Sequence, residues 1–514
     1  MSIQTSDNNK RIAKNTMLLY CRMLLLMVVS LYTSRVTLAA LGVEDYGIYN
    51  VVGGVVAMFS MLSGSLSAAI SRFITFELGR GDKERLKTVF STSVNIQIGL
   101  AIIIMVLAEI GGVWFLNCKM NIATERLLAA NWVLQCSIIT FMINLISVPY
   151  NAAIIAHERM SAFAYISILE AVLKLLVVYL LYVTLYDRLI VYAVLLCLVA
   201  IALRLIYGIY CKRNFEECTY HFIYDKSILR SMTGFAGWNF IGVASGALRG
   251  QGVNIVINLF CGAAVNAARA ISFQVNNAVN SFASNFMTAI NPQITKSYAS
   301  GNYGYMMQLI FQGARLSYYL LLFISLPLIL EADTVLKLWL EEVPEHTTLF
   351  VQLILVFGME EALSNPLITA MLATGDIKKY QLTVGGLQLM NFPVSYMLLK
   401  FGLFPEVTII AAIVIGQWCL ATRLYMLRSM IGLSSIAFMK KVYLNIVSVS
   451  IVAMLPPLLL HIVMIEDRWL RFFAVLAVSV VSTLASIYYI GCSKSERDLV
   501  VQKSKQLISK IRNK

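Results

Sequence analysis

The sequence predicts an all-α integral membrane protein of about 14 transmembrane helices. Its composition gives the first reason, because 59% of its 514 residues are hydrophobic, 13% are charged and the mean hydropathy is +0.76. The second reason is that apolar stretches of about 20 residues, the length of a bilayer-crossing helix, follow one another with short polar breaks. The third is an internal duplication. We therefore expect two pseudo-repeated six-helix lobes and two additional C-terminal helices.

The duplication relates residues 42–81 to residues 262–301. An offset of about 220 positions places Gly42 on Gly262 and Gly81 on Gly301. An offset about three positions shorter gives further matches, which are Pro149 on Pro366, Ala153 on Ala370 and Ala156 on Ala373. Two copies of a several-span unit in the same order are typical of transporters, in which paired bundles line a central pathway.

The spans and polar breaks predict six parts. These are a cytoplasmic N-terminal segment (1–15), an N-lobe of six spans (16–211), a cytoplasmic linker (212–233), a C-lobe of six spans (234–431), two additional spans (442–491) and a basic cytoplasmic tail (492–514). Placing the N-terminus in the cytoplasm puts most of the 41 Lys and Arg residues on the cytoplasmic side. Both termini are therefore expected to be cytoplasmic.

Arginines inside predicted spans mark candidate functional positions. An ionisable group in hydrocarbon is costly unless it faces protein or water. Arg22 and Arg35 lie on the first predicted helix, Arg249 on the seventh and Arg269 on the eighth. The planar guanidinium donates paired hydrogen bonds to phosphate and stays charged in a partly dry cavity. The pattern indicates an anionic cargo that carries a phosphate or pyrophosphate.

Amide side chains accompany these arginines. The candidates are Asn239, Gln251, Asn254 and Asn276. Amides both donate and accept hydrogen bonds, which suits the hydroxyls of a sugar. Two structural alternatives stay open at this point: the amides could join helices to one another, and Arg35 and Arg269 could extend to the outer headgroups.

Acidic residues in the spans form two close pairs. Glu170 and Lys174 are spaced i,i+4 on the fifth predicted helix, which favours an intramembrane ion pair. Glu360 and Glu361 lie on the tenth, where adjacent carboxylates could bind a proton or a cation. Structural pairing is the first interpretation for both pairs, and ion coupling is the alternative.

No cofactor or metal is expected. Cys211, Cys218 and His221 form a metal-like cluster, but their spacing matches no standard zinc pattern. The sequence has no GxxxxGK[ST] phosphate-binding loop, so ATP hydrolysis by this chain is not expected. The net charge of +14 fits basic loops beside an anionic membrane leaflet and needs no nucleic acid.

The run from Asn15 through YGIY (46–49) to FELGRGD (76–82) resembles the start of bacterial polysaccharide repeat-unit flippases. These proteins belong to the multidrug/oligosaccharidyl-lipid/polysaccharide exporter (MOP) superfamily. The resemblance covers nearly the whole chain and implies two lobes in a V-shaped arrangement, like that of multidrug and toxin extrusion (MATE) transporters, around a cationic cavity. It also implies a function in surface polysaccharide biosynthesis, whether of O-antigen, capsule or exopolysaccharide.

The cargo implied by the resemblance is an undecaprenyl-pyrophosphate-linked oligosaccharide, moved by alternating access to the outer leaflet of the bacterial inner membrane. Implied partners are membrane lipids, a polysaccharide polymerase and a chain-length regulator.

Three alternatives to this function stay open. A multidrug or cation antiporter of the same superfamily is disfavoured because the first and seventh predicted helices carry arginine and no carboxylate. A peptidoglycan-precursor lipid flippase would also fit two extra helices. A polytopic glycosyltransferase or polysaccharide polymerase is a different class, and the short outside loop near residues 331–346 disfavours it.

Overall fold

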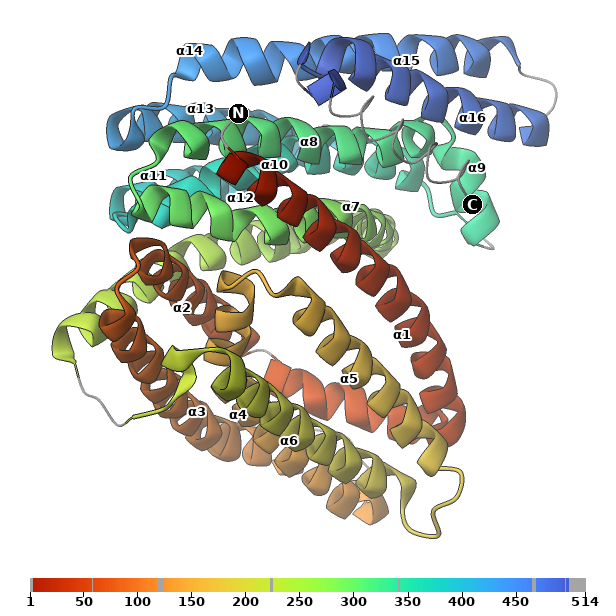
Figure 1. The fold of residues 1–514 in the computed structure, drawn as a ribbon. Coiled ribbons are helices and arrows are strands. Elements are labelled where there is room, and N and C mark those ends of the chain that lie inside the picture. Colours follow the sequence, from red (N-terminus) through yellow and green to blue (C-terminus); the bar gives the residue numbers. More distant parts are fainter. Residues whose placement is uncertain are drawn as a thin grey trace, which may run out of the picture. The chain divides into compact units, whose positions relative to one another are not determined.

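The computed structural model describes residues 3–57, 59–118, 124–221, 225–340, 343–464, 468–494 and 496–498. Every regular element in these ranges is a helix (Figure 1), so the predicted all-α class is confirmed. The chain forms two compact units. Unit 1 comprises Met1–Ala244 and Thr288–Asn302, and unit 2 comprises Ser245–Met287 and Tyr303–Lys514.

Unit 1 contains six helices and the first part of a seventh. They are α1 (Ile3–Ala57), α2 (Ser60–Arg80), α3 (Lys83–Cys118), α4 (Leu127–Ala156), α5 (Met160–Leu180), α6 (Arg188–Asn214) and the beginning of α7 (Lys226–Ala299), with short 3-10 turns η1 (Thr124–Arg126) and η2 (Glu216–Cys218). The helix α1 already begins at Ile3, so the predicted separate segment 1–15 is helical from that residue onward.

Unit 2 contains the middle of α7 and the remaining helices. They are α8 (Tyr303–Leu330), α9 (Ala332–Trp339), α10 (Thr347–Thr374), α11 (Lys378–Leu389), α12 (Asn391–Lys400), α13 (Val407–Ile431), α14 (Ser435–Phe438), α15 (Leu444–Val463) and α16 (Arg468–Ser486), with π-helical turns η3 (Met439–Tyr443) and η4 (Ile487–Gly491). Most of the predicted basic tail, 492–514, lies outside the described residues.

Twelve helices among the described residues are long and apolar enough to cross a membrane. The two predicted spans missing from that set are 46–70 and 265–290. The second is helical throughout, whereas the first is divided between the end of α1 and the start of α2; serines lower the apolar character of the first and amides that of the second. Each begins just beyond a kink, in α1 and α7 respectively. The prediction of about 14 helices is compatible with these twelve spans and two more polar helices.

Equivalent glycines of the duplication have the same backbone conformation. Gly42 (φ 81°, ψ 169°) kinks α1, and Gly262 (φ 84°, ψ 179°) kinks α7. Gly81 (φ 77°) follows α2, and Gly301 (φ 73°) comes just after α7. Positive φ angles of this kind are readily adopted only by glycine. The repeat in the sequence therefore corresponds to a repeat in the backbone.

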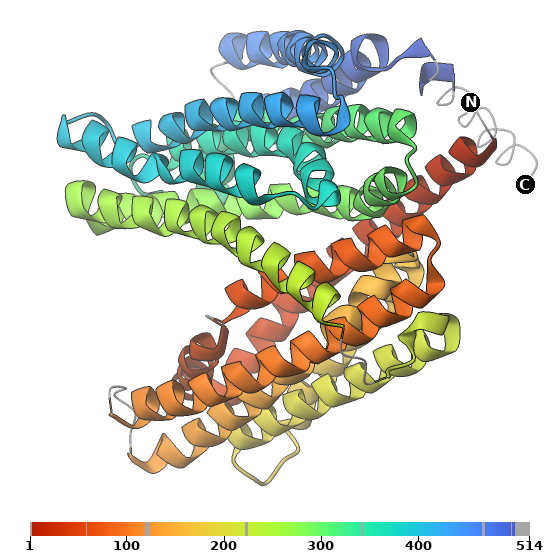
Figure 2. The same cartoon turned by 90° about the vertical axis from the view of Figure 1, so that its left-hand side faces the viewer.

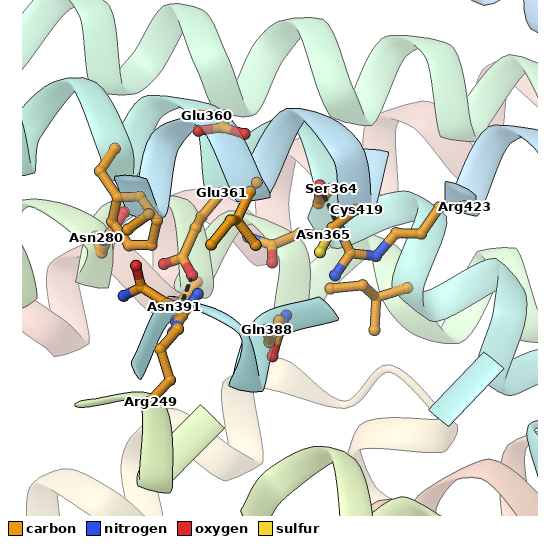
Figure 3. Close-up of a pocket in the computed structure, with 16 residues that line it drawn as sticks. Arg249, Asn280, Glu360, Glu361, Ser364, Asn365, Gln388, Asn391, Cys419 and Arg423 are labelled. Carbon is orange, nitrogen blue, oxygen red and sulfur yellow. Dashed lines mark hydrogen bonds and ion pairs between the residues drawn. The ribbon is translucent and has the colours of Figure 1, made fainter. Parts of the chain in front are cut away.

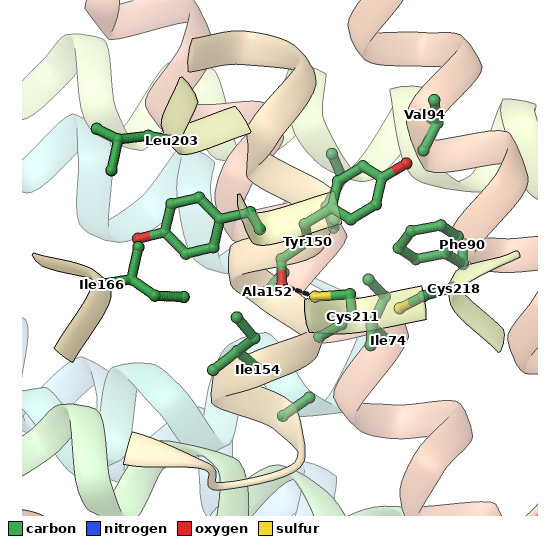
Figure 4. Packing of buried hydrophobic residues seen from close by; sticks show 14 of the residues in the cluster. Ile74, Phe90, Val94, Tyr150, Ala152, Ile154, Ile166, Leu203, Cys211 and Cys218 are labelled. Carbon is green, nitrogen blue, oxygen red and sulfur yellow. Dashed lines mark hydrogen bonds between the residues drawn. The ribbon is translucent and has the colours of Figure 1, made fainter. Parts of the chain in front are cut away.

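The core of unit 1 joins α3, α4 and α6 (Figure 4). Phe90 and Tyr150 pack edge to face, with ring centroids 5.1 Å apart. Cys211 donates a hydrogen bond to the Tyr150 carbonyl at 3.6 Å, and Cys218 is buried beside it. The two cysteines of the metal-like cluster therefore belong to this apolar core.

A buried carboxylate attaches the end of α7 to unit 1. The side chain of Glu158 is fully buried and lies 2.8 Å from Arg11 Nε and 2.7 Å from Lys296 Nζ. Gln293 donates to both carboxylate oxygens at 2.7 Å. A Cβ added at Gly79 of α2 would lie 2.8 Å from the Lys296 Cα, so the two helices are in close contact. Residues 288–302 therefore pack on unit 1, although the predicted lobe boundary was 212–233.

The two additional helices pack against α8 within unit 2 and are seen in blue in Figures 1 and 2. At one end, the Glu331 carboxylate lies 2.8 Å from His461 Nδ1 of α15 and 3.0 Å from Arg471 Nε of α16. At the other end, Arg315 of α8 lies 2.8 Å from Glu496, just beyond η4. Glu331, just after α8, thus contacts α15 and α16 at one end, and at the other end Arg315 of α8 holds the segment that follows α16.

Candidate functional site

A polar cavity of about 240 Å³ lies among the membrane-crossing helices of unit 2 (Figure 3). Its polar and charged lining residues come from five helices: Arg249, Asn280 and Ser284 of α7; Glu360, Glu361, Ser364 and Asn365 of α10; Gln388 of α11; Asn391 of α12; and Arg423 of α13. Two arginines, two carboxylates and four amides therefore surround one space, which we call the unit 2 cavity.

Arg249 and Glu361 form an ion pair on the wall of this cavity. Arg249 Nη2 lies 2.9 Å from Glu361 Oε1 (Figure 3), and the guanidinium also lies 5.2 Å from the ring centroid of Phe357. The Arg249 side chain is 22% exposed and that of Glu361 is 42% exposed. A partly exposed pair of this kind can exchange its internal carboxylate for an external anion.

Arg423 is a cavity residue that the sequence argument missed. It is buried, and it donates from Nη1 to Ser364 Oγ at 3.0 Å and from Nε to Tyr380 Oη at 3.4 Å. Both acceptors are neutral hydroxyls. Arg423 lies near the end of the predicted span 407–430, where an arginine is expected to extend to the headgroups, which explains the omission.

Glu360 and Glu361 project in different directions although they are adjacent in sequence (Figure 3). The Glu360 carboxylate is buried against Gly416 of α13, where an added Cβ would lie only 2.3 Å from Oε1. Among the described residues, its Oε2 has no hydrogen-bond partner. The two carboxylates are thus not one chelating pair.

Asn276 lies behind the cavity wall. Its Oδ1 accepts a hydrogen bond at 3.1 Å from Asn280 Nδ2, and Asn280 lines the cavity. A Cβ at Gly358 of α10 would lie 2.4 Å from that oxygen, so the glycine allows α10 to approach the amides closely. Asn276 therefore positions a cavity residue.

Three other predicted residues form a separate cluster in unit 2. Arg269 is 5% exposed and donates to Asn254 Oδ1, and Asn254 donates to Gln251 at 3.2 Å. The Arg269 guanidinium also lies 4.4 Å from the ring centroid of Phe273. Arg269, Asn254 and Gln251 do not line the unit 2 cavity.

Unit 1 has polar cavities of its own. Arg22, Glu170 and Lys174 line one of about 470 Å³, together with serine, threonine and tyrosine hydroxyls. Lys174 Nζ lies 2.6 Å from Glu170 Oε1, in the predicted i,i+4 pair, and the pair also lines an adjoining cavity of about 460 Å³. The Arg22 guanidinium lies 4.5 Å from the ring centroid of Phe163. We call this pair of spaces the unit 1 cavities.

The cavities of the two units occupy corresponding places in the duplication. At the offsets given above, Arg249 falls on Val29 and Glu361 on Asn144, and both counterparts line the unit 1 cavities. In unit 1 the charge comes instead from Arg22 of α1 and from the α5 pair. The two remaining predicted residues line none of these cavities: Arg35 is exposed on α1 and Asn239 is buried on α7.

Solved structures of membrane transporters have the same fold. A MATE transporter in the straight conformation gives a TM-score of 0.70 at 14% identity, over 84% of this chain and 97% of that chain. An outward-facing multidrug-resistance MATE transporter of the MOP superfamily gives 0.68 at 16%, over 83% and 96%. A MOP superfamily transporter from Pyrococcus furiosus gives 0.68 at 14%, over 83% and 96%. The molecule is thus a multi-pass membrane protein with the fold of MOP superfamily transporters.

The family follows from the sequence match. Residues 10–298 match the model of the family described as polysaccharide biosynthesis protein. The chain belongs to this family, so the resemblance to polysaccharide flippases of the MOP superfamily is confirmed. A comparison with curated proteins finds no significant match.

Proposed function

We propose that the chain is a flippase that moves undecaprenyl-pyrophosphate-linked oligosaccharide units from the cytoplasmic to the outer leaflet of the bacterial inner membrane. The family and the fold support a transporter in polysaccharide biosynthesis. The observation that carries the proposed cargo is the unit 2 cavity, in which two arginines and four amides meet among membrane-crossing helices. Arginine suits the pyrophosphate and amides suit the glycan.

The Arg249–Glu361 pair suggests how the cargo is bound and released. In the structure the Glu361 carboxylate is the anion that contacts Arg249. The pyrophosphate would replace the Glu361 carboxylate on Arg249 and accept two hydrogen bonds from its guanidinium. Glu361 would then turn toward sugar hydroxyls. Because the internal anion returns when the cargo leaves, Arg249 never stays unpaired in the membrane.

A multidrug cation exporter is the second candidate, favoured by the carboxylates of Glu360 and Glu361. Two features count against it. The Glu361 carboxylate is paired with Arg249, and Arg423 balances the formal charge of Glu360, so the lining carries no excess negative charge for a cation. The Pyrococcus furiosus transporter is described as having a binding pocket of reverse polarity that suggests a different function. In this chain, the two arginines of the unit 2 cavity support an anionic cargo.

The remaining proposals concern the cellular setting. The distribution of basic residues supports cytoplasmic termini, and the delivered unit would be used by a polysaccharide polymerase under a chain-length regulator. Because the sequence has no ATP-binding loop, the driving force would be an ion gradient, the membrane potential or consumption of the product.

The first test is deletion of the gene in its own bacterium, followed by mass spectrometry of undecaprenyl-linked oligosaccharides and analysis of surface polymers. We expect loss of one surface polymer and accumulation of its lipid-linked unit. Unchanged glycans together with altered drug susceptibility would identify the exporter instead.

Substitutions then test the unit 2 cavity. Arg249→Ala and Arg423→Ala should lower restoration of the polymer by at least about tenfold, because each removes a charge-assisted contact. Arg428→Ala is the matched control, since this arginine is exposed on the same helix as Arg423 and does not line the cavity. Immunoblots of the membrane fraction would show equal insertion. Full restoration by both cavity variants would exclude this site.

A further inference from the structure

A second polar cavity, of about 640 Å³, lies in unit 2 beside α8 and the ends of the two additional helices. Its polar lining residues are Gln308, Gln312, Arg315, Lys441, Asn445, Ser493 and Glu496. None of them lines the unit 2 cavity. We call this space the α8 cavity.

Both π-helical turns of the described chain border the α8 cavity. Lys441 belongs to η3, and Gly491 closes η4. Asn445 of α15 connects η4 to α8, because it donates to the Ile490 carbonyl at 3.0 Å and accepts from the Tyr319 hydroxyl. π-helical turns are rare and are frequent at functional sites. Two of them at one cavity indicate a built site.

The α8 cavity already holds an internal anion. The Glu496 carboxylate accepts from Arg315 Nη2 at 2.8 Å and from Gln312 Nε2 at 3.2 Å. Its second oxygen accepts from Ser493 N at 2.7 Å and from Ser493 Oγ at 2.9 Å. Arg315 is held in place by a further bond to the Gly491 carbonyl at 3.1 Å. Four donors around one carboxylate are the arrangement of an anion site.

The lining residues carry a net positive charge, since Arg315 and Lys441 exceed Glu496 by one. Lys441 is exposed, so its ammonium group is available to a ligand. The predicted topology places this end of α8 at the cytoplasmic leaflet, where anionic lipids are concentrated. A space of this volume is large enough for a phosphate with part of its glycerol.

We propose that the α8 cavity binds the phosphate group of an anionic phospholipid. A phosphate oxygen replaces Glu496 on Arg315 and Gln312, and Lys441 supplies the second positive charge. Because arginine binds phosphate as well as carboxylate, the phosphate accepts hydrogen bonds from the same Arg315 and Gln312 donors that Glu496 leaves. Displacement of Glu496 frees the segment after η4 from α8. The site is independent of the proposed cargo, so either can fail without the other.

The test uses the full chain, purified and incorporated into nanodiscs with equal amounts of phosphatidylglycerol and phosphatidylcholine. Native mass spectrometry then measures the lipid that stays bound. We expect preferential retention of phosphatidylglycerol, lowered about fivefold by Lys441→Ala, because one basic side chain near the membrane contributes that much. Glu496→Gln should raise retention, since it removes the competing carboxylate.

Lys440→Ala is the matched control, because this exposed lysine lies in the same π-helical turn and does not line the cavity. It should leave retention unchanged. Equal retention of the two lipids, or equal effects of Lys440→Ala and Lys441→Ala, would overturn the proposal. Thermal stabilisation by inorganic phosphate without preferential lipid retention would also overturn it and would assign the site to a soluble phosphate.

Discussion

In the unit 2 cavity, the Glu360 carboxylate occupies the space that a side chain at position 416 would need. An alanine Cβ at position 416 would lie 2.3 Å from Glu360 Oε1 and 2.8 Å from its Cδ, so the carboxylate would have to move. Added volume in a packed interior costs about 1–3 kcal/mol. We expect Gly416→Ala to lower restoration of the surface polymer about tenfold and to lower the unfolding free energy by about 1–3 kcal/mol. Complementation measures the first effect and thermal unfolding the second.

Gly386→Ala provides the control for this substitution. It lies on α11 of the same unit, and an added Cβ would meet no atom within 4 Å. This variant should be as active and as stable as the parent. Full activity of Gly416→Ala with an unchanged melting temperature would mean that the position of the Glu360 carboxylate has no role in transport.

Single residues were only partly predictable from the sequence. The rule that charge in hydrocarbon has a purpose identified Arg249, Glu360 and Glu361 before any coordinates. The same rule could not separate cavity residues from the buried Arg269 cluster, because both contain charged groups inside predicted spans and differ only in their three-dimensional packing. Arg423 was missed because the span 407–430 gives no sign of which of its arginines is buried against Ser364 and Tyr380 of other helices.

At the level of helices, the paired kinks at Gly42 and Gly262 carry a prediction. Their backbone angles lie in a region that other residues enter at a cost of about 1–3 kcal/mol. We expect Gly42→Ala and Gly262→Ala each to lower the melting temperature and the transport activity, because the helix must strain or straighten. Thermal unfolding of the purified proteins and complementation measure the two effects.

Gly47→Ala and Gly250→Ala are matched controls on the same two helices. Their φ angles are not positive, and added Cβ atoms would meet nothing within 4 Å. Both should be neutral or slightly stabilising, since alanine favours helix. Unaltered stability of the kink variants would show that the kinks are set by packing and not by glycine. The alignment of the two repeats predicted that Gly42 corresponds to Gly262. It could not predict the kinks at these glycines, because a kink inside a helix leaves no separate pattern in hydropathy.

In the molecule as a whole, Glu331 joins α15 and α16 to the rest of unit 2. Burial alone would raise the pKa of Glu331, but hydrogen bonds from His461, Thr334 and Arg471 hold it below the usual glutamate value. A lowered pKa means that this carboxylate stabilises the fold above its unfolded pKa of about 4.3. That stability is lost as the pH falls through the lower, folded pKa.

We therefore expect Glu331→Gln to lower the unfolding free energy by about 3 kcal/mol at neutral pH, because it leaves the largely buried Arg471 guanidinium without its carboxylate partner. The difference from the parent should shrink below about pH 4. Thermal unfolding across a pH series measures it. Asp333→Asn, at an exposed i,i+4 pair with Lys337, should change little at any pH. A Glu331 difference that stays constant with pH would contradict a role for its charge.

The whole-molecule architecture was largely accessible from the sequence, because repeated apolar spans can fold in lipid only as helices. The division into units was not. The sequence places residues 226–244 and 288–302 next to C-lobe spans, yet contacts such as the 2.5 Å hydrogen bond from Ser65 Oγ to the Ala236 carbonyl attach them to unit 1. Long-range contacts of this kind have no local pattern.

The attachment of residues 288–302 to unit 1 has a consequence for biosynthesis. The ribosome makes Gln293 and Lys296 only after the first part of unit 2, residues 245–287, has been synthesised. Until then Glu158 lacks two of its three side-chain partners, and a translation product that stops at Ala244 would never acquire them. Membrane insertion of the first half can thus run ahead of its folding, because unit 1 stays incomplete until the end of α7 has been made.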